Sequence, residues 1–295
     1  HATDIDSAEA VRFIRENKDH PFNISLWHRS VHTSYGDEHL LAAERNQSLY
    51  KDQPIERRLS AQPGFVVQPS LKGFAQKPPT DEDIRNIARM TVDIDDGVGE
   101  IYRALEEEGI LDKTMIIFIG DNGFFFGEHG LTEKRLAYEE SIRVPFFVRY
   151  PPLIKAGSRS EVGVLNIDIA PTLLELAGIP VPSEMQGQDL LPVFQGDELQ
   201  DPRSALLFEF WPETDLPGQK SWWKAVRTDR WKYVRYYKEP FYDELYDLEN
   251  DPYEMTNLIE SQSHQDTLNH MKSELERLMI KYDDKGGNYH FWADL

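Results

Sequence analysis

Apolar side chains recur every three or four residues over 80–108, which predicts a long amphipathic helix with one buried face. Both ends of this segment carry helix signals. Thr80 is followed three residues later by Asp83, as in a capping box, and Gly109 stands where a glycine commonly follows a helix. The segment is therefore expected to be a single helix with defined ends.

Two apolar runs, 115–119 and 144–148, predict strands. The first is apolar at every position and is expected to be a buried strand of parallel type. Asp229-Arg230 separates two further runs by two residues, the spacing of a tight hairpin. Segment 36–79 has no sustained period and is interpreted as a surface excursion. The other expected elements are helices over 6–18, 168–178 and 262–282, and strands over 22–27, 205–210, 223–228, 231–237 and 244–248.

Strands and helices alternate through the first part of the chain, which predicts an α/β fold with a mostly parallel sheet flanked by helices. Composition changes between Gln195 and Arg203, and short strands followed by one long helix come after it. We therefore predict an α/β domain over 1–200 and a small antiparallel subdomain, a sheet with one packed helix, over 201–295.

Composition restricts the partners of the chain. With 295 residues, 40% of them hydrophobic, it can bury a substantial core, and no apolar run approaches the ~20 residues that cross a bilayer. A net charge of −20 argues against nucleic-acid binding, which relies on Lys and Arg. An anionic substrate would need a local cation cluster or a bound metal to overcome that charge. Because cysteine is absent, thiolate metal sites are excluded.

Candidate chemistry follows the apolar run 115–119. Asp121 and Asn122 come at its end, in Gly120-Asp121-Asn122-Gly123. A carboxylate and an amide oxygen suit a hard cation such as calcium or magnesium, although the same residues also form ordinary turns. Lys134 lies twelve residues beyond Asn122, and the loop Gly127-Glu128-His129-Gly130 comes between them.

The segment from Thr114 to Pro151 resembles the sulfatase family of the alkaline-phosphatase-like superfamily. The likeness rests on the order of its parts: the DNG turn, the GEHG loop, the lysine, and the YEESIRVP entry to the next strand. It continues through RTDRWKYVRY and ELYDLENDPYEMTNL, which look most like carbohydrate sulfatases, including the N-acetylglucosamine-6-sulfatase type. The resemblance implies an alkaline-phosphatase-like fold and hydrolysis of the sulfate ester of a sulfated carbohydrate or aryl sulfate.

The resemblance also implies roles for single residues. Asp121 and Asn122 would ligate a divalent cation, usually calcium. Lys134 would be both a catalytic and a substrate-binding cation, placed on the sulfate oxygens where charge develops. His129 would shape the GEHG loop and the edge of the substrate-binding pocket, and a structural role is expected for it ahead of a catalytic one.

His32 matches the histidine of the family that faces the sulfate or the leaving oxygen. An imidazole with a pKa near neutrality is a suitable proton donor to such an oxygen. The family usually has proline two residues later, where this chain has Ser34, and His28 and His39 are nearby alternatives.

The nucleophile of the family is a formylglycine, made from cysteine or serine in a C-x-P-x-R or S-x-P-x-R segment, and this sequence contains neither. The family also places two acidic calcium ligands near its N-terminus, which are not recognisable here. We therefore expect the C-terminal portion of a sulfatase, inactive on its own, with uncovered apolar surface that favours oligomerisation or a covering N-terminal segment. Family members are periplasmic, secreted or lysosomal, and the sequence itself assigns no compartment.

Two other functions stay open. A phosphonate or phosphate monoester hydrolase of the same superfamily shares the cation and formylglycine chemistry. A non-catalytic sulfatase-like protein would instead bind sulfated glycans or a partner.

Several polar and aromatic residues have structural interpretations. Asp168 is interpreted as a helix N-cap, and Arg143 as an ion-pair partner of Glu139 or Glu140. Exposed or capping roles are expected for three aspartates of the long helix, Asp93, Asp95 and Asp96. Core roles are expected for three tryptophans, with stacking on a sugar ring as the alternative: Trp211, Trp222 and Trp223.

Overall fold

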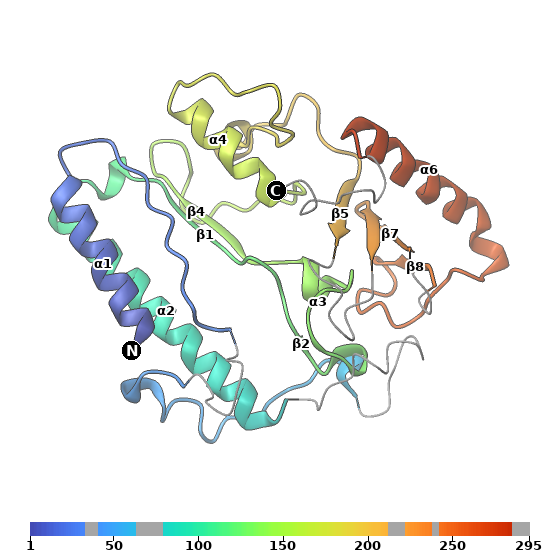
Figure 1. Ribbon diagram of the computed structural model, residues 1–295, viewed down its shortest axis with the longest axis horizontal. Helices are drawn as coiled ribbons and strands as arrows, with labels where there is room; N and C mark the ends of the chain where they lie inside the picture. The colour runs from blue at the N-terminus through green and yellow to red at the C-terminus, as the bar shows by residue number, and fades with distance from the viewer. Residues whose placement is uncertain (33–40, 63–78, 212–221, 238–241, 285–295) are drawn as a thin grey trace, which may run out of the picture. The chain divides into compact units, whose positions relative to one another are not determined.

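The computed structural model describes residues 1–32, 41–62, 79–211, 222–237 and 242–284 (Figure 1). The chain divides into two compact units. Unit 1 contains His1–Arg57, Lys77–Phe118 and Phe147–Pro152, and unit 2 contains Arg58–Gln76, Ile119–Phe146 and Leu153–Leu295. The boundary predicted between residues 200 and 201 stays a prediction.

Unit 1 is organised by two helices that lie side by side, α1 (Ala2–Asn17) and α2 (Asp81–Glu107) (Figure 1). The predicted capping box of α2 is confirmed, because Thr80 and Asp83 each accept a backbone N–H from the other residue. The helices approach closely at Gly97, where an added Cβ would lie 2.1 Å from Ser7 Oγ. A larger residue at this position would push the two helices apart.

Asp93 of α2 is fully buried, so the expectation of an exposed or capping role is wrong for this residue. Its carboxylate accepts the backbone N–H of Ala43 and the side-chain amide of Asn46, both at 2.8 Å. The short 3₁₀ helix η1 (Glu44–Asn46) thereby folds over α2. The reason lies in tertiary structure, since a buried carboxylate must find hydrogen-bond donors and this loop supplies them.

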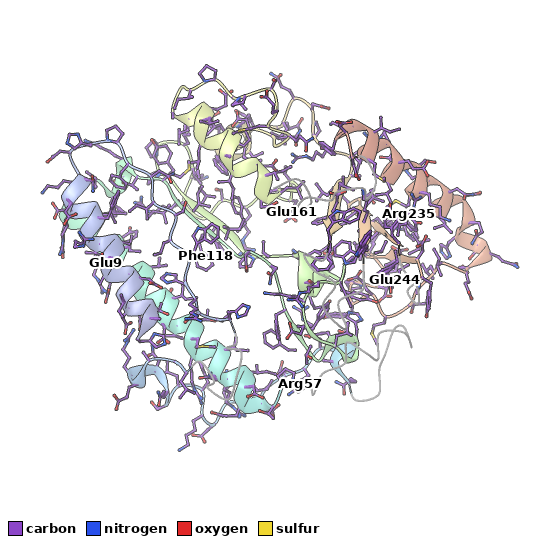
Figure 2. The ribbon with its side chains drawn as sticks, in the orientation of Figure 1. Glu9, Arg57, Phe118, Glu161, Arg235 and Glu244 are labelled. Atoms are coloured by element: carbon purple, nitrogen blue, oxygen red, sulfur yellow. The ribbon has the colours of Figure 1, made fainter. Side chains whose placement is uncertain are left out.

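Strands β1 (Ile116–Ile119) and β4 (Phe146–Arg149) form a two-stranded sheet, as expected from the two apolar runs (Figure 1). β1 is only partly buried, however, and its Phe118 is labelled in Figure 2. The ring of Phe118 contacts that of the exposed Phe147 at a centroid distance of 6.2 Å. The prediction of a buried strand is therefore wrong, because each of these strands has one neighbour among the described residues. Segment 22–27 forms no strand, and its Trp27 is 87% exposed.

Unit 2 contains an antiparallel four-stranded sheet, and the predicted hairpin lies at its centre. Helix α6 (Gln265–Lys281) packs its apolar side chains on this sheet (Figure 1). The expected C-terminal sheet with one packed helix is confirmed. Its strands, in spatial order, are β5 (Leu206–Phe210), β6 (Trp223–Arg227), β7 (Trp231–Tyr236) and β8 (Glu244–Asp247).

Shorter elements complete the described chain. None of the helices in these residues is long and apolar enough to span a membrane. The elements are η2 (Leu59–Ala61), η4 (Leu111–Lys113), β2 (Phe125–Phe126), η5 (Glu128–Gly130), β3 (Thr132–Glu133), α3 (Glu139–Ile142), η6 (Asn166–Asp168), α4 (Ile169–Leu176), α5 (Leu191–Gln195) and η7 (Gln262–His264).

Asp168 occupies the N-cap position of α4, but its carboxylate does not cap that helix. It is fully buried and accepts two bonds from the Arg203 guanidinium, at 2.6 and 2.8 Å. The backbone N–H groups of Leu165 and Gln188 donate to the same carboxylate. The N-cap interpretation is corrected to a buried ion pair, which joins Asp168 to the segments of Leu165, Gln188 and Arg203.

Replacing Arg203 with alanine should lower the free energy of unfolding by about 3 kcal/mol, because Asp168 would remain buried without its cation. Urea titration followed by circular dichroism measures this loss. Arg277→Ala, which breaks the exposed pair with Glu274, is the matched control and should cost under about 1 kcal/mol. Equal losses in the two variants would contradict the assignment.

Candidate functional site

The candidate site is built around Ser141, which is buried in the short helix α3 of unit 2. Its carbonyl accepts the N–H of Gly123 at 2.8 Å, and its hydroxyl accepts the N–H of Arg135 at 3.2 Å. Gly123 follows Asn122, and Arg135 follows Lys134. One residue therefore anchors both the candidate metal turn and the candidate sulfate-binding lysine.

The Asp-Asn-Gly turn is held against α3 by close contact. A Cβ on Gly123 would lie 1.9 Å from the carbonyl oxygen of Glu140, so a glycine is required there. The exposed Asp121 accepts the backbone N–H of Asn122 at 2.8 Å. The Asn122 amide nitrogen donates to the Gly123 carbonyl at 2.8 Å, which leaves its side-chain oxygen available as a ligand.

These two residues fit a hard cation, because both offer oxygen atoms and neither is paired with a cation of the described residues. They do not make a complete metal site by themselves. Among the described residues, no group of three or more His, Asp or Glu side chains is placed to hold a metal ion. The calcium role of Asp121 and Asn122 therefore stays a proposal.

Lys134 is half-buried and lies between two residues with left-handed backbone, Glu133 at φ +86° and Arg135 at φ +85°. Such conformations cost roughly 1–3 kcal/mol in a non-glycine residue and persist only where the surrounding structure imposes them. Within the described part of the chain, Lys134 and Arg135 have no carboxylate partner. Two uncompensated cations thus stand together in a strongly acidic protein, as an anionic ligand requires.

His129 is fully buried, with left-handed backbone at φ +58°. Its ring stacks on Tyr138 at a centroid distance of 4.1 Å, and its Nε2 lies 3.3 Å from the Glu140 carboxylate. The ring packs inside the core, which favours a role in the architecture of the GEHG loop, and its contact with substrate stays a prediction.

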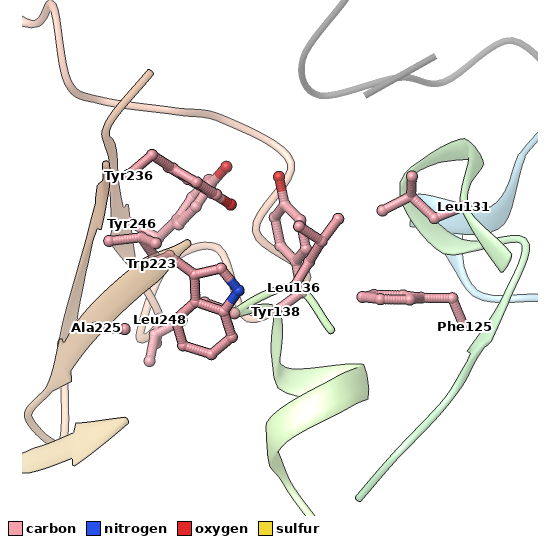
Figure 3. Packing of buried hydrophobic residues seen from close by; sticks show 11 residues of the cluster. Phe125, Leu131, Leu136, Tyr138, Trp223, Ala225, Tyr236, Tyr246 and Leu248 are labelled. Atoms are coloured by element: carbon pink, nitrogen blue, oxygen red, sulfur yellow. The ribbon is translucent and has the colours of Figure 1, made fainter. Parts of the chain in front are cut away.

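A buried cluster joins the GEHG loop to the C-terminal sheet (Figure 3). Tyr138 donates to Glu244 of β8 at 2.6 Å, and Tyr236 of β7 donates to the same carboxylate at 3.3 Å. Burial, followed by the charge of Glu244, raises the pKa of Tyr138. Apolar side chains from both sides fill the space around this bond: Phe125, Leu131, Leu136, Trp223, Tyr246 and Leu248.

Glu139 begins α3 and is bound by cations of the C-terminal sheet. Its carboxylate accepts Lys232 at 3.2 Å and Arg227 at 3.1 Å, and its N–H donates to Glu254 at 2.7 Å. Lys232 also pairs with Glu254, and both are fully buried. The ion pair expected from Arg143 to Glu139 or Glu140 is absent among the described residues, because other groups occupy these carboxylates.

The histidine candidates belong to unit 1. His32 is exposed and follows a turn closed by its N–H on the Arg29 carbonyl, and its catalytic role stays a prediction. His28 is mostly buried, and burial lowers its pKa. His39 lies outside the described residues.

The tryptophans divide between core and partly buried positions. Trp223 is buried in the cluster below the GEHG loop, as expected. Trp211 and Trp222 contact each other at a centroid distance of 5.3 Å and are only partly buried.

Two family models match the chain. One, described as sulfatase, matches residues 3–179, and one, described as the C-terminal part of N-sulphoglucosamine sulphohydrolase, matches residues 127–281. The chain belongs to the sulfatase family. The GEHG loop, Lys134 and the YEESIRVP entry lie where these two matches overlap, and the DNG turn lies within the sulfatase match alone.

Similar proteins support the same assignment. The sulfatase chain is 35% identical to N-acetylglucosamine-6-O-sulfatase of Bacteroides thetaiotaomicron over 205 residues, which cover 68% of this chain and 36% of that protein. The chain thus spans about a third of this relative. A solved structure in complex with its substrate D-glucosamine-2-N,6-O-disulfate aligns with a TM-score of 0.86 and 24% identity, over 97% of this chain and 71% of that one. The predicted alkaline-phosphatase-like fold is confirmed.

A phosphonate monoester hydrolase of Agrobacterium radiobacter also aligns with the sulfatase chain, with a TM-score of 0.60 and 28% identity. The alignment covers 69% of this chain and 43% of the hydrolase. The fold alone therefore does not distinguish sulfate from phosphonate esters.

Glu254 should make the stability of this sulfatase chain depend on pH. Burial, opposed by Lys232, raises the pKa of its carboxyl group from 4.5 to about 7. The folded state therefore holds a proton that the unfolded state has lost between these values. Its contribution is fully present below pH 4.5 and disappears as the pH rises through 7, by up to roughly 3 kcal/mol.

Urea unfolding at pH 5, 6, 7 and 8 measures this slope. Glu254→Gln should flatten the curve relative to the parent chain, whereas Glu260→Gln, at an exposed carboxylate of the same unit, should leave it unchanged. Parallel curves for the parent chain and Glu254→Gln would contradict the assignment.

Proposed function

We propose that this chain forms the cation-binding and sulfate-binding part of a sulfuric ester hydrolase that acts on a sulfated carbohydrate or an aryl sulfate. The observation that carries the proposal is the pair of hydrogen bonds at Ser141, which fix the residues next to Asn122 and Lys134 on one anchor. Family membership supports sulfate-ester hydrolysis, and the name of the Bacteroides relative favours a sulfated glucosamine as the substrate class.

Asp121 and Asn122 would hold calcium through their side-chain oxygens. When bound, the cation would supply positive charge against the non-bridging oxygens of the ester. Lys134 would bind the same sulfate with its ammonium group, which has no carboxylate partner in the described structure. His32 would donate a proton to the leaving oxygen. His129 would hold the GEHG loop in place by stacking on Tyr138 and contacting the Glu140 carboxylate.

A second candidate, hydrolysis of phosphonate or phosphate monoesters, is favoured by the similarity to the phosphonate monoester hydrolase. The relative turnover of matched sulfate and phosphate esters separates the two. Preference for 4-nitrophenyl sulfate over 4-nitrophenyl phosphate would support the sulfatase proposal, and the reverse preference would replace it.

Calcium should bind this chain weakly, with a dissociation constant in roughly the millimolar range, because two protein ligands leave most of the six to eight positions to water. Isothermal titration calorimetry measures this affinity. Asp121→Ala should abolish the binding, and Asp197→Ala, at an exposed carboxylate of the same unit, should not change it. Tight binding by the parent chain, or binding that survives Asp121→Ala, would contradict this ligand set.

Lys134→Ala should lower kcat/KM for 4-nitrophenyl sulfate by about 100-fold or more, since one preorganised electrostatic group is worth about 10²–10³ in rate. The assay uses the protein expressed from its native locus. Lys155→Ala, which removes an exposed lysine of the same unit, is the control and should keep the parental rate. Turnover that is unaffected by Lys134→Ala would refute the proposed role, and no turnover by the parent protein would favour a non-catalytic sulfatase-like binding protein.

A further inference from the structure

Trp223 of the C-terminal sheet makes a hydrogen bond to the loop that carries Lys134. Its indole N–H donates to the backbone carbonyl of Arg135 at 2.7 Å, across 88 residues of sequence. The tryptophan itself is 3% exposed. A buried indole N–H needs an acceptor, and here the acceptor is the peptide next to the candidate sulfate-binding residue.

The sheet fixes the position of this indole. Trp223 pairs in register with Phe210 of β5 and Tyr236 of β7, and its ring stacks on that of Phe210 at a centroid distance of 6.1 Å. Figure 3 shows the indole nitrogen on the side of the ring that faces Leu136 and Tyr138. The donor is therefore held by a regular sheet and not by a loop.

Arg135 is clamped on both sides of its α-carbon. Its N–H donates to Ser141 Oγ and its carbonyl accepts from Trp223. On the other side of Lys134, Glu133 pairs with Phe125 in the short β2–β3 ladder. Both flanking residues have left-handed backbone, which requires such external restraint. Lys134, whose ammonium group has no partner among the described residues, thus lies between two residues with a restrained backbone.

We infer that Trp223 is a positioning residue of the active site, which sets the backbone direction of Lys134 through the Arg135 carbonyl. The inference rests on the proposed function, because it needs Lys134 to contact the sulfate. It makes the C-terminal sheet a part of the catalytic apparatus. Trp223 itself would touch neither substrate nor metal.

The test is a double-mutant cycle on 4-nitrophenyl sulfate hydrolysis, with variants expressed from the native locus. Trp223→Phe keeps an aromatic ring but removes the N–H, and kcat should fall about 10- to 100-fold, the effect of misplacing a catalytic group by about 1 Å. In a Lys134→Ala background the same substitution should change kcat less than about twofold, because the residue being positioned is gone.

The controls separate positioning from a general loss of structure. Trp231→Phe makes the same change in the same sheet, at an indole that does not bond the loop, and should keep the parental kcat. Calcium affinity should be unchanged in Trp223→Phe, since the lost bond ends on the Arg135 carbonyl, whereas the Asp121 turn is anchored by the bond from the Gly123 N–H to the Ser141 carbonyl. If Trp223→Phe does not fold, benzothienylalanine at position 223, which has the shape of tryptophan without the N–H, takes its place.

Each outcome decides between the two proposals. A loss of kcat in Trp223→Phe that disappears in the Lys134→Ala background supports the inference. An equal loss in both backgrounds, or no loss in either, overturns the positioning role while leaving the role of Lys134 intact. If Lys134→Ala itself has no effect, the proposed function fails and this inference fails with it.

Discussion

The candidate site depends on one short turn, residues 138–141, whose four side chains reach four different segments. Successive residues of a helical turn point about 100° apart, so neighbouring positions diverge and each meets another part of unit 2. Tyr138 bonds Glu244, Glu139 bonds Lys232, and Glu140 bonds His129. Ser141 holds the Asp121-Asn122-Gly123 turn and the loop of Lys134. Residues 138–141 therefore join the loops of the candidate site to the C-terminal sheet, although α3 is only four residues long.

This turn is maintained by charges that are buried and matched. Lys232 and Glu254 are fully buried, and burying ions costs several kcal/mol each unless other groups satisfy them. Here the ammonium meets Glu139 and Glu254, while Glu254 also accepts the N–H of Glu139. An apolar replacement could be as stable, but it would not specify the direction of each loop. Among the described residues, the buried cations Lys232 and Arg203 are paired with carboxylates, whereas Lys134 is not.

Local patterns predicted the elements whose signals are local. The α2 helix follows its capping box, the β6–β7 hairpin follows its two-residue turn, and α6 follows its apolar period. The strand predicted over 22–27 is not formed, because an apolar run needs a neighbouring strand to pair with. The roles expected for Asp93 and Asp168 are wrong for a related reason. Their hydrogen-bond partners Ala43 and Arg203 lie 50 and 35 residues away in sequence, and a local pattern does not identify such distant partners.

The sequence indicates only part of the candidate site. The resemblance proposes Asp121, Asn122 and Lys134 from the order of the motifs along the chain. The sequence assigns no role to Ser141 and only a core role, or sugar stacking, to Trp223, because a serine hydroxyl or an indole N–H acquires its function from the peptide it contacts in the fold. One signal is present in the sequence, because Ser141 belongs to the YEESIRVP entry that follows Lys134 in the motif order.

The way in which Lys134 is held fits the chemistry of its proposed role, binding of a sulfate. A lysine ammonium sits on a flexible four-carbon stem, and the usual way to fix it is to pair it with a carboxylate. Such a partner would neutralise the charge that a sulfate must meet, and the protein already carries a net charge of −20. The remaining option is to fix the backbone and leave the ammonium unpaired. Left-handed residues on both sides of Lys134, held by a strand ladder, a serine hydroxyl and an indole N–H, accomplish this.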